Sequence, residues 1–237
     1  MALTSLYSEP ERPQEAAEAP ALDCRDVFKI HRSGPVETVA LRGLDLRVER
    51  GELVAVLGPS GCGKSTLLSL AAGLDEPSAG EVRAFGASLG LMGERALARH
   101  RAATIALVFQ SENLWPALSA RANVALSLAL AGPGEHDEPE AALAAFGLRD
   151  RARVRAGLLS GGEQQRVAIA AAAARRAPLV LADEPTGELD EASEREVLAA
   201  FERLRTETGS AIVVVTHSPR VAEAADRVVE LRDGRLA

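Results

Sequence analysis

The chain has 237 residues and a formal net charge of −7, with 34 acidic side chains against 27 Lys and Arg. This acidic balance argues against a general nucleic-acid-binding protein, which would carry a basic surface. Hydrophobic residues make up 47% of the chain, so it can bury a core and is not disordered overall. The longest purely apolar run, residues 167–174, is far shorter than the roughly 20 residues that a membrane span needs.

The N-terminal residues 1–20 have the composition of an acidic, disordered tail. They contain four Glu, one Arg and three Pro among few large apolar residues. They lack a basic region followed by an apolar core, so we do not expect a signal peptide. Cys24 and Cys62 are the only cysteines, too few for a disulfide framework. We therefore expect a cytoplasmic protein with one folded domain over residues 21–237.

From residue 21 onward, the hydrophobic pattern predicts strands that alternate with helices. Apolar residues alternate with charged ones over 44–48, which is typical of a strand with one buried face. Residues 52–57 form a short apolar run next to glycines, which is typical of a buried strand. The pattern then predicts, in chain order, a helix over 64–72, a strand over 104–109, a helix over 161–176, a strand over 178–183, a helix over 191–207, a strand over 211–216 and a hairpin over 227–236.

This order of elements favours an α/β fold with a mainly parallel sheet. In the predicted helix over 191–207, Val197, Phe201 and Leu204 fall on one apolar stripe at i, i+4 and i+7. Residues 111–160 differ from the rest, because they are rich in Ala and Leu and have no β-branched runs. We interpret them as an inserted helical subdomain.

The glycine-rich stretch GPSGCGKS at 58–65 matches the pattern G-x-x-x-x-G-K-[ST], and it lies between a predicted strand and a predicted helix. Glycines let backbone N–H groups turn towards an anion, and the helix N-terminus adds positive partial charge. Lys64 can then reach the β- and γ-phosphates of a nucleotide, and Ser65 can ligate Mg²⁺. Cys62 contributes its N–H and not its sulfur. The candidate phosphate-binding residues are Gly58, Pro59, Ser60, Gly61, Cys62, Gly63, Lys64, Ser65 and Thr66.

The predicted strand over 178–183 ends in two acidic residues, Asp183 and Glu184. Ligands of a parallel sheet bind beyond the carboxyl ends of its strands. Asp183 could hold Mg²⁺ directly or through water, and Glu184 could orient and polarise an attacking water. Such a pair on its own also fits an exposed turn, but the phosphate-binding loop in the same chain favours the catalytic interpretation.

The string LSGGEQQR at 159–166 precedes a predicted helix. Ser160 can cap this helix, and Glu163 three residues later completes a capping box. Two glycines and a serine at a helix N-terminus also form an anion site. Because the phosphate loop already serves the chain's own nucleotide, we predict that Ser160, Gly161, Gly162 and Glu163 serve a nucleotide held by a second copy.

The ordered set of motifs resembles the ATP-binding-cassette (ABC) ATPases over about residues 22–237. The set consists of the phosphate loop, Gln110 after a strand, LSGGEQQR, LADEP at 181–185, residues 187–190, and His217 after a strand. The resemblance implies an α/β P-loop NTPase (RecA-like) core, an N-terminal antiparallel β subdomain, and a helical subdomain inserted at about 111–160. It also implies an ATPase that uses ATP and Mg²⁺ and dimerises around two ATP molecules.

The resemblance further implies roles for single residues. Gln110 would contact Mg²⁺ and the attacking water, Glu184 would be the catalytic carboxylate, and His217 would contact the γ-phosphate. Asp190 would link the two sites across a dimer, and His31 stands where the family has an aromatic residue that stacks on adenine. Apart from the family pattern, a Gln or a His after an apolar strand is also compatible with a structural role.

Residues 182–190 and the Thr216–His217 pair look like one branch, which contains lipoprotein-releasing, macrolide-exporter and cell-division ATPases. Its members pair with a separate integral-membrane permease, so we expect a peripheral location on the inner face of the cell membrane, with residues 111–160 docking on the permease. The alternative is a non-transporting ABC ATPase that signals mechanically through a membrane partner. A soluble ABC protein of DNA repair or translation is disfavoured by the single cassette, and a phosphate-loop kinase has no use for LSGGE.

Overall fold

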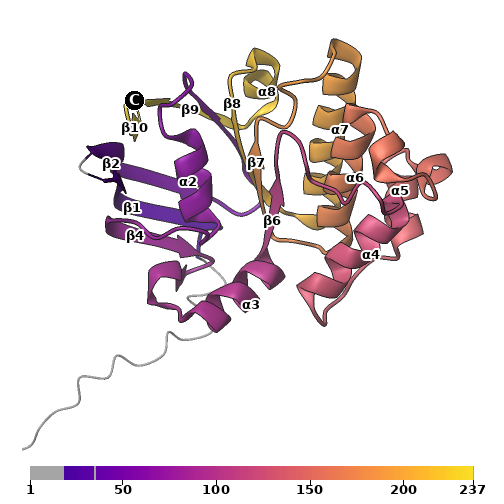
Figure 1. Ribbon diagram of the computed structural model, residues 1–237, viewed down its shortest axis with the longest axis horizontal. Coiled ribbons are helices and arrows are strands. Elements are labelled where there is room, and N and C mark those ends of the chain that lie inside the picture. Colours follow the sequence, from indigo (N-terminus) through magenta and orange to yellow (C-terminus); the bar gives the residue numbers. More distant parts are fainter. Residues whose placement is uncertain (1–18, 35, 237) are drawn as a thin grey trace, which may run out of the picture.

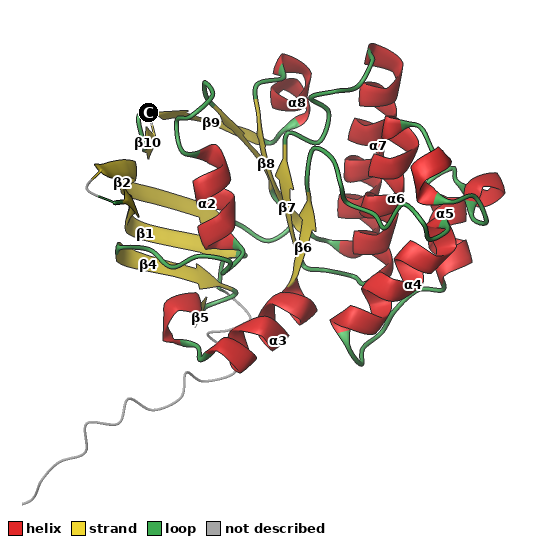
Figure 2. Cartoon of the chain, in the orientation of Figure 1, coloured by secondary structure: helices red, strands yellow, loops and turns green. Residues whose placement is uncertain are grey.

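The computed structural model describes residues 19–34 and 36–236, and within them the chain forms two sheets and a set of helices (Figures 1 and 2). The predicted acidic tail lies outside the described residues except for its last two positions. The strands are β1 (Leu22–Ser33), β2 (Val36–Val48), β3 (Leu53–Leu57), β4 (Ala79–Ala84), β5 (Ala87–Ser88), β6 (Ile105–Val108), β7 (Leu179–Asp183), β8 (Ala211–Thr216), β9 (Arg227–Arg232) and β10 (Arg235–Leu236). The helices are α2 (Lys64–Ala71), α3 (Glu94–Thr104), α4 (Ala120–Ala131), α5 (Pro139–Ala145), α6 (Gly161–Ala174), α7 (Glu191–Thr208) and α8 (Pro219–Ala224), with short 3₁₀ turns at Leu89–Leu91, Arg149–Arg151 and Ala156–Leu158.

The larger sheet has the strand order β10-β9-β3-β8-β7-β6, and its strands pair in parallel except for the β9–β10 hairpin. Successive side chains of a strand point to opposite faces. In β8, Val213 and Val215 pack on the side of α2, whereas Ile212 and Val214 pack on the side of α6 and α7. Because both faces are covered, the central strands β3, β7 and β8 are apolar runs without alternation, as the sequence predicts.

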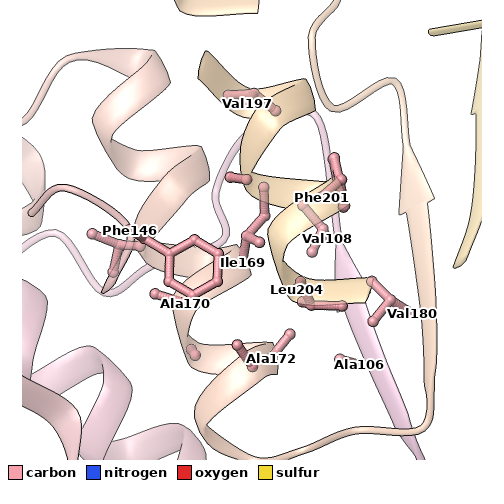
Figure 3. Close-up of a cluster of buried hydrophobic side chains, with 14 of the residues drawn as sticks. Ala106, Val108, Phe146, Ile169, Ala170, Ala172, Val180, Val197, Phe201 and Leu204 are labelled. Atoms are coloured by element: carbon pink, nitrogen blue, oxygen red, sulfur yellow. The ribbon is translucent and has the colours of Figure 1, made fainter. Parts of the chain in front are cut away.

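The core on the α6–α7 side contains the predicted apolar stripe of α7. Val197, Phe201 and Leu204 are at most 1% exposed. Figure 3 shows them gathered with Ile169 of α6 and Val180 of β7. Burial of this stripe fixes α7 against the sheet and so sets where the first turn of α7 lies relative to the strand ends.

The smaller sheet is antiparallel, in the order β2-β1-β4-β5, and α2 lies between the two sheets (Figure 1). Leu22, Leu41 and Leu44 of this sheet share a buried cluster with Leu67 and Leu70 of α2. The start of α2 is therefore held between the central sheet and the antiparallel subdomain.

Between β6 and α6 the chain forms the predicted helical subdomain, in which α4 and α5 pack on α6. Leu143, Phe146 and Leu148 are buried in the same core as the α7 stripe.

The predicted fold class, a phosphate-loop NTPase core with an antiparallel β subdomain and inserted helices, is confirmed. No helix among the described residues is long and apolar enough to cross a bilayer.

The predicted strands and helices are present, most of them with small differences at their ends, but the strand predicted over 44–48 begins much earlier, because β2 starts at Val36. The predicted hairpin turns at Asp233 and Gly234, which both have positive φ. The sequence patterns did not reveal β1, β4, β5, α3 or α8. None of the residues of α3 is fully buried, so it has no apolar stripe. β1 carries register irregularities between Cys24 and Val27 and again near Ile30, which interrupt its alternation.

We predict that Phe201→Ala destabilises the chain by about 3–5 kcal/mol, because it removes a buried ring from a packed core. The free energy of unfolding is measured by urea denaturation. Leu130→Ala on α4 is the control, since Leu130 is 70% exposed and should change stability by less than about 0.5 kcal/mol. Equal stability changes in the two variants would contradict the core assignment.

Candidate functional site

A cavity of about 560 Å³ lies at the carboxyl ends of four neighbouring strands, β3, β8, β7 and β6. Ligands of parallel α/β sheets bind at this edge. The residues lining the cavity are Gly58, Pro59, Ser60, Gly61, Gly63, Lys64, Ser65, Thr66, Gln110, Asp183, Glu184 and His217. The fold thus brings together most of the residues that the sequence predicted for phosphate binding, metal binding and catalysis.

The loop after β3 wraps around the side chain of Lys64. The Lys64 ammonium donates to the carbonyls of Gly58 at 2.7 Å and Pro59 at 3.1 Å. Gly58 has no room for a side chain, because a Cβ there would lie 2.4 Å from the carbonyl oxygen of Leu231. Cys62 is buried and does not line the cavity, and its backbone N–H donates to the carbonyl of Pro59 at 3.4 Å.

Gly63 joins this loop to the antiparallel subdomain. Its φ is +110°, a value that favours glycine, and a Cβ would lie 2.6 Å from the carbonyl oxygen of Ala40 in β2. The start of α2 therefore approaches β2 backbone to backbone. This close approach fixes the direction in which the N-terminus of α2 faces the cavity.

Glu184 makes the central contacts of the cavity. Its carboxylate lies 3.7 Å from the Lys64 ammonium and 3.0 Å from His217 Nδ1, and it also accepts the His217 backbone N–H at 3.2 Å. Glu184 has a φ of +44°, an unusual value for a residue with a side chain, and its own N–H donates to Val215 of β8. The backbone of two strands thus holds this strained residue in place.

The oxygen donors predicted for Mg²⁺ line the same cavity. Asp183 is the last residue of β7, Ser65 lies in the first turn of α2, and Gln110 follows β6. Mg²⁺ is usually held by one or two carboxylates together with substrate phosphates and waters. One carboxylate, one hydroxyl and one amide oxygen beside a phosphate loop fit that pattern. The described residues contain no cluster of three or more His, Cys, Asp or Glu that would hold a metal ion by itself.

The loop that carries Gln110 is held by α6, through a residue to which the sequence assigned no role. Gln165 is 3% exposed, and its amide donates to the carbonyls of Phe109 at 2.8 Å and Gln110 at 2.7 Å. It also accepts from Asn113 at 3.1 Å. The Gln110 amide donates to Glu188 at 3.1 Å. Gln165 lies in the polar run of residues 163–166 at the start of α6, so the sequence does not distinguish it from its neighbours, and its partners lie more than 50 positions away.

The LSGGEQQR string begins α6 with the predicted capping box. Ser160 Oγ accepts from the Glu163 backbone N–H, and the Glu163 carboxylate accepts from the Ser160 N–H at 2.8 Å. The Arg151 guanidinium donates to the same carboxylate, and together these bonds hold the pKa of Glu163 below its usual value. Ser160 and Gly161 are exposed and do not line the cavity. One chain therefore does not bring this helix end to its own phosphate loop.

Gly162 is buried where α6 meets the first turn of α7. A Cβ at Gly162 would lie 2.9 Å from Cβ of Ser193. Asp190 caps α7, and its carboxylate accepts the backbone N–H groups of Ala192 and Ser193, each at 2.9 Å. These bonds lower the pKa of Asp190, and the bond from the Ser193 backbone has the largest effect. Asp190 also lies outside the lining of the cavity.

His31 lies on β1 beside the first turn of α2. Its Nε2 is 3.5 Å from the hydroxyl of Thr66, which lines the cavity. Phe28 is not at this place, because its ring lies against Gly43 of the paired strand. The structure therefore brings His31, and not Phe28, next to the phosphate loop.

Comparisons with known proteins agree with this geometry. The family model described as ABC transporter matches residues 41–187. The lipoprotein-releasing system ATP-binding protein LolD of Chromohalobacter salexigens is 45% identical over 219 residues, which cover 91% of this chain and 92% of that protein. The macrolide export ATP-binding/permease protein MacB of an Azoarcus species is 41% identical over 230 residues, but these cover only 35% of its length.

Two solved structures have the same fold. A dimeric bacterial ABC transporter cassette is 36% identical, with a TM-score of 0.82 over 91% of this chain and 96% of that one. A dimeric ATP-binding cassette in a post-hydrolysis state with ADP and Pi is 35% identical, with a TM-score of 0.81. With its phosphate loop, acidic strand end and LSGGE helix, the chain belongs to the ABC transporter family, as an ATP-binding subunit that hydrolyses ATP.

Proposed function

We propose that two copies of this chain enclose two ATP molecules and drive a separate membrane permease. One observation carries the proposal: Lys64, Glu184 and His217 meet at one cavity, whereas the capped helix end at residues 160–163, where Ser160 and Gly161 are exposed, lies outside it. A second copy would supply that helix end to the first copy's nucleotide. Two solved relatives are described as dimeric, which supports this arrangement.

In this proposal the N–H groups of the phosphate loop and the Lys64 ammonium bind the β- and γ-phosphates. Glu184 orients and polarises the attacking water, and His217 contacts the γ-phosphate. Ser65, Gln110 and Asp183 would hold Mg²⁺, which would neutralise phosphate charge when bound. The chain's residues act by positioning and by charge, with little covalent chemistry of their own.

The residues of the dimer interface have separate roles. Ser160, Gly161, Gly162 and Glu163 bind the γ-phosphate held by the partner chain, with the N-terminus of α6 supplying positive partial charge. Asp190 connects the two sites across the dimer. His31 stacks on adenine, which its position beside Thr66 supports. ATP acts as a ligand that favours the closed dimer, and hydrolysis reopens it.

The cassette spans residues 21–237, and the helical subdomain at about 111–160 docks on the permease. Three large apolar side chains of this region are exposed: Trp115 at 66%, Leu118 at 37% and Leu158 at 78%. They are near neighbours, because the Gly157 N–H donates to the carbonyl of Pro116. Exposed apolar groups of this kind often mark protein interfaces. The chain would then be cytoplasmic and peripheral on the inner face of the cell membrane, with no nucleic-acid partner.

The alternative, a cell-division type of ABC ATPase that signals without transport, is not favoured. The relatives described above are named for lipoprotein release and macrolide export. The chain spans about a third of the macrolide export protein, whose name includes a permease as well as an ATP-binding part. Relatives of both kinds support a role in transport.

We predict that Glu184→Gln binds ATP with nearly unchanged affinity but loses at least about 99% of its turnover, because the amide cannot polarise water as a carboxylate does. Binding is measured by titration of a fluorescent ATP analogue, and turnover by phosphate release. Lys64→Ala is the complementary variant, since it should weaken ATP binding instead. Wild-type turnover in Glu184→Gln would remove Glu184 from the catalytic role.

We predict that Ser160→Arg prevents ATP-driven dimerisation and leaves ATP binding by the monomer intact. The added cation and its bulk would occupy the exposed helix end that the partner's phosphate needs. Dimerisation is followed by size-exclusion chromatography with ATP, in the Glu184→Gln background. Ala141→Arg on the exposed side of α5 adds the same charge elsewhere and should not affect dimers. Normal dimers of Ser160→Arg would disprove the role in trans.

The coupling to a permease is tested by an ATP-trapped pull-down from the natural host. Tagged Glu184→Gln is expressed, given ATP and Mg²⁺, and purified from gently solubilised membranes, with Lys64→Ala as the control that cannot trap the dimer. We expect an integral-membrane permease to co-purify with Glu184→Gln only. Recovery of an intact trapped dimer with soluble proteins alone would overturn the transporter role and leave the ATPase.

A further inference from the structure

Glu194 lies in the first turn of α7, away from the cavity lining, and its side chain is only 12% exposed. A buried carboxylate is costly unless partners satisfy it. Its Oε1 accepts from Ser218 Oγ at 2.6 Å, and its Oε2 pairs with Arg220 at 2.9 Å. Burial alone would raise the pKa of Glu194, but the bonds from Ser218 and Arg220 outweigh it and lower the pKa. Glu194 is therefore a charged group with several fixed partners.

Ser218 connects Glu194 to the loop that carries His217. A serine just before a helix usually caps that helix, but Ser218 makes no side-chain cap to α8 and donates to Glu194 instead. The Ser218 N–H donates to the Thr216 hydroxyl at 3.0 Å, at the end of β8. His217 thus lies between Ser218, which is hydrogen-bonded to α7, and Thr216, which is the last residue of β8.

The same carboxylate reaches the loop after β7. The Thr186 hydroxyl donates to Glu194 Oε1 at 3.4 Å, and Thr186 is 5% exposed. Thr186 follows Glu184 by two residues and lies in the segment that leads to Asp190. The loops of Glu184 and His217 are therefore joined twice, directly by their own contact and indirectly through Glu194.

We propose that Glu194 is a positioning residue for ATP hydrolysis, which holds the loops of Glu184 and His217 in place against the first turn of α7. The inference rests on the proposed roles of Glu184 and His217. Misplacement of a reacting group by about 1 Å can lower a rate about 100-fold, so loosening these loops reduces turnover. The phosphate loop belongs to β3 and α2, and Glu194 does not contact it, so ATP affinity is independent of Glu194.

The test compares kcat and ATP affinity in variants of the full chain. We expect Glu194→Ala to lower kcat about tenfold and to change the Kd for ATP by less than about twofold. Glu194→Gln, which keeps an oxygen acceptor for Ser218, should retain more of the activity. The double variant Glu194→Ala/Ser218→Ala should be no slower than Glu194→Ala alone, since both changes break the same hydrogen bond.

Glu207→Ala is the matched control, because Glu207 lies on the same helix in an exposed ion pair with Arg203. A kcat for Glu194→Ala equal to that of Glu207→Ala would overturn the inference, as would equal losses in kcat and in ATP affinity. If Glu194→Ala does not fold, Glu194→Gln and Ser218→Ala give the same comparison. Glu184→Gln is assayed in parallel, since turnover in that variant, or none in the wild type, would refute the proposed function itself.

Discussion

The contact of Glu184 with both Lys64 and His217 is the interaction on which the rest of the site depends. Glu184 follows β7 and His217 follows β8, whereas Lys64 is the first residue of α2, the helix after β3. They meet because β3, β8 and β7 are parallel neighbours, so their carboxyl ends lie at one edge of the sheet. Burial of both faces of that sheet fixes the strands in this order, and the strained backbone of Glu184 is held by a bond to β8.

Helices α6 and α7 position the LSGGE helix end, Asp190 and the loop of His217. The close approach of Gly162 to Ser193 joins the LSGGE helix end to the turn that Asp190 caps. One residue further along, Glu194 reaches the loop of His217. The first turn of α7 therefore contacts both the loop proposed to serve the chain's own nucleotide and the helix end proposed to serve the partner's nucleotide. A movement of this turn would affect both parts together.

The helical subdomain is connected to the cavity by hydrogen bonds as well as by apolar packing. Gln165 of α6 holds the backbone at Phe109 and Gln110, where the chain leaves the sheet for the subdomain. Gln110 lines the cavity, while Trp115 a few residues later is exposed on the proposed docking surface. A short segment thus extends from the nucleotide site to the proposed permease contact, which gives a physical route for coupling between them.

The sequence by itself determined the central strands, the phosphate loop, the capping box of Ser160 and the stripe of α7, because each depends on local spacing or apolar period. It did not reveal α3, which buries no side chain completely, or β1, whose bulges interrupt the alternation. Only the tertiary structure decided the partners of Gln165, Glu188 and Glu194, since their bonds join elements far apart along the chain. A local pattern can specify a loop or a cap, but a buried polar contact between distant elements exists only once the core has packed them together.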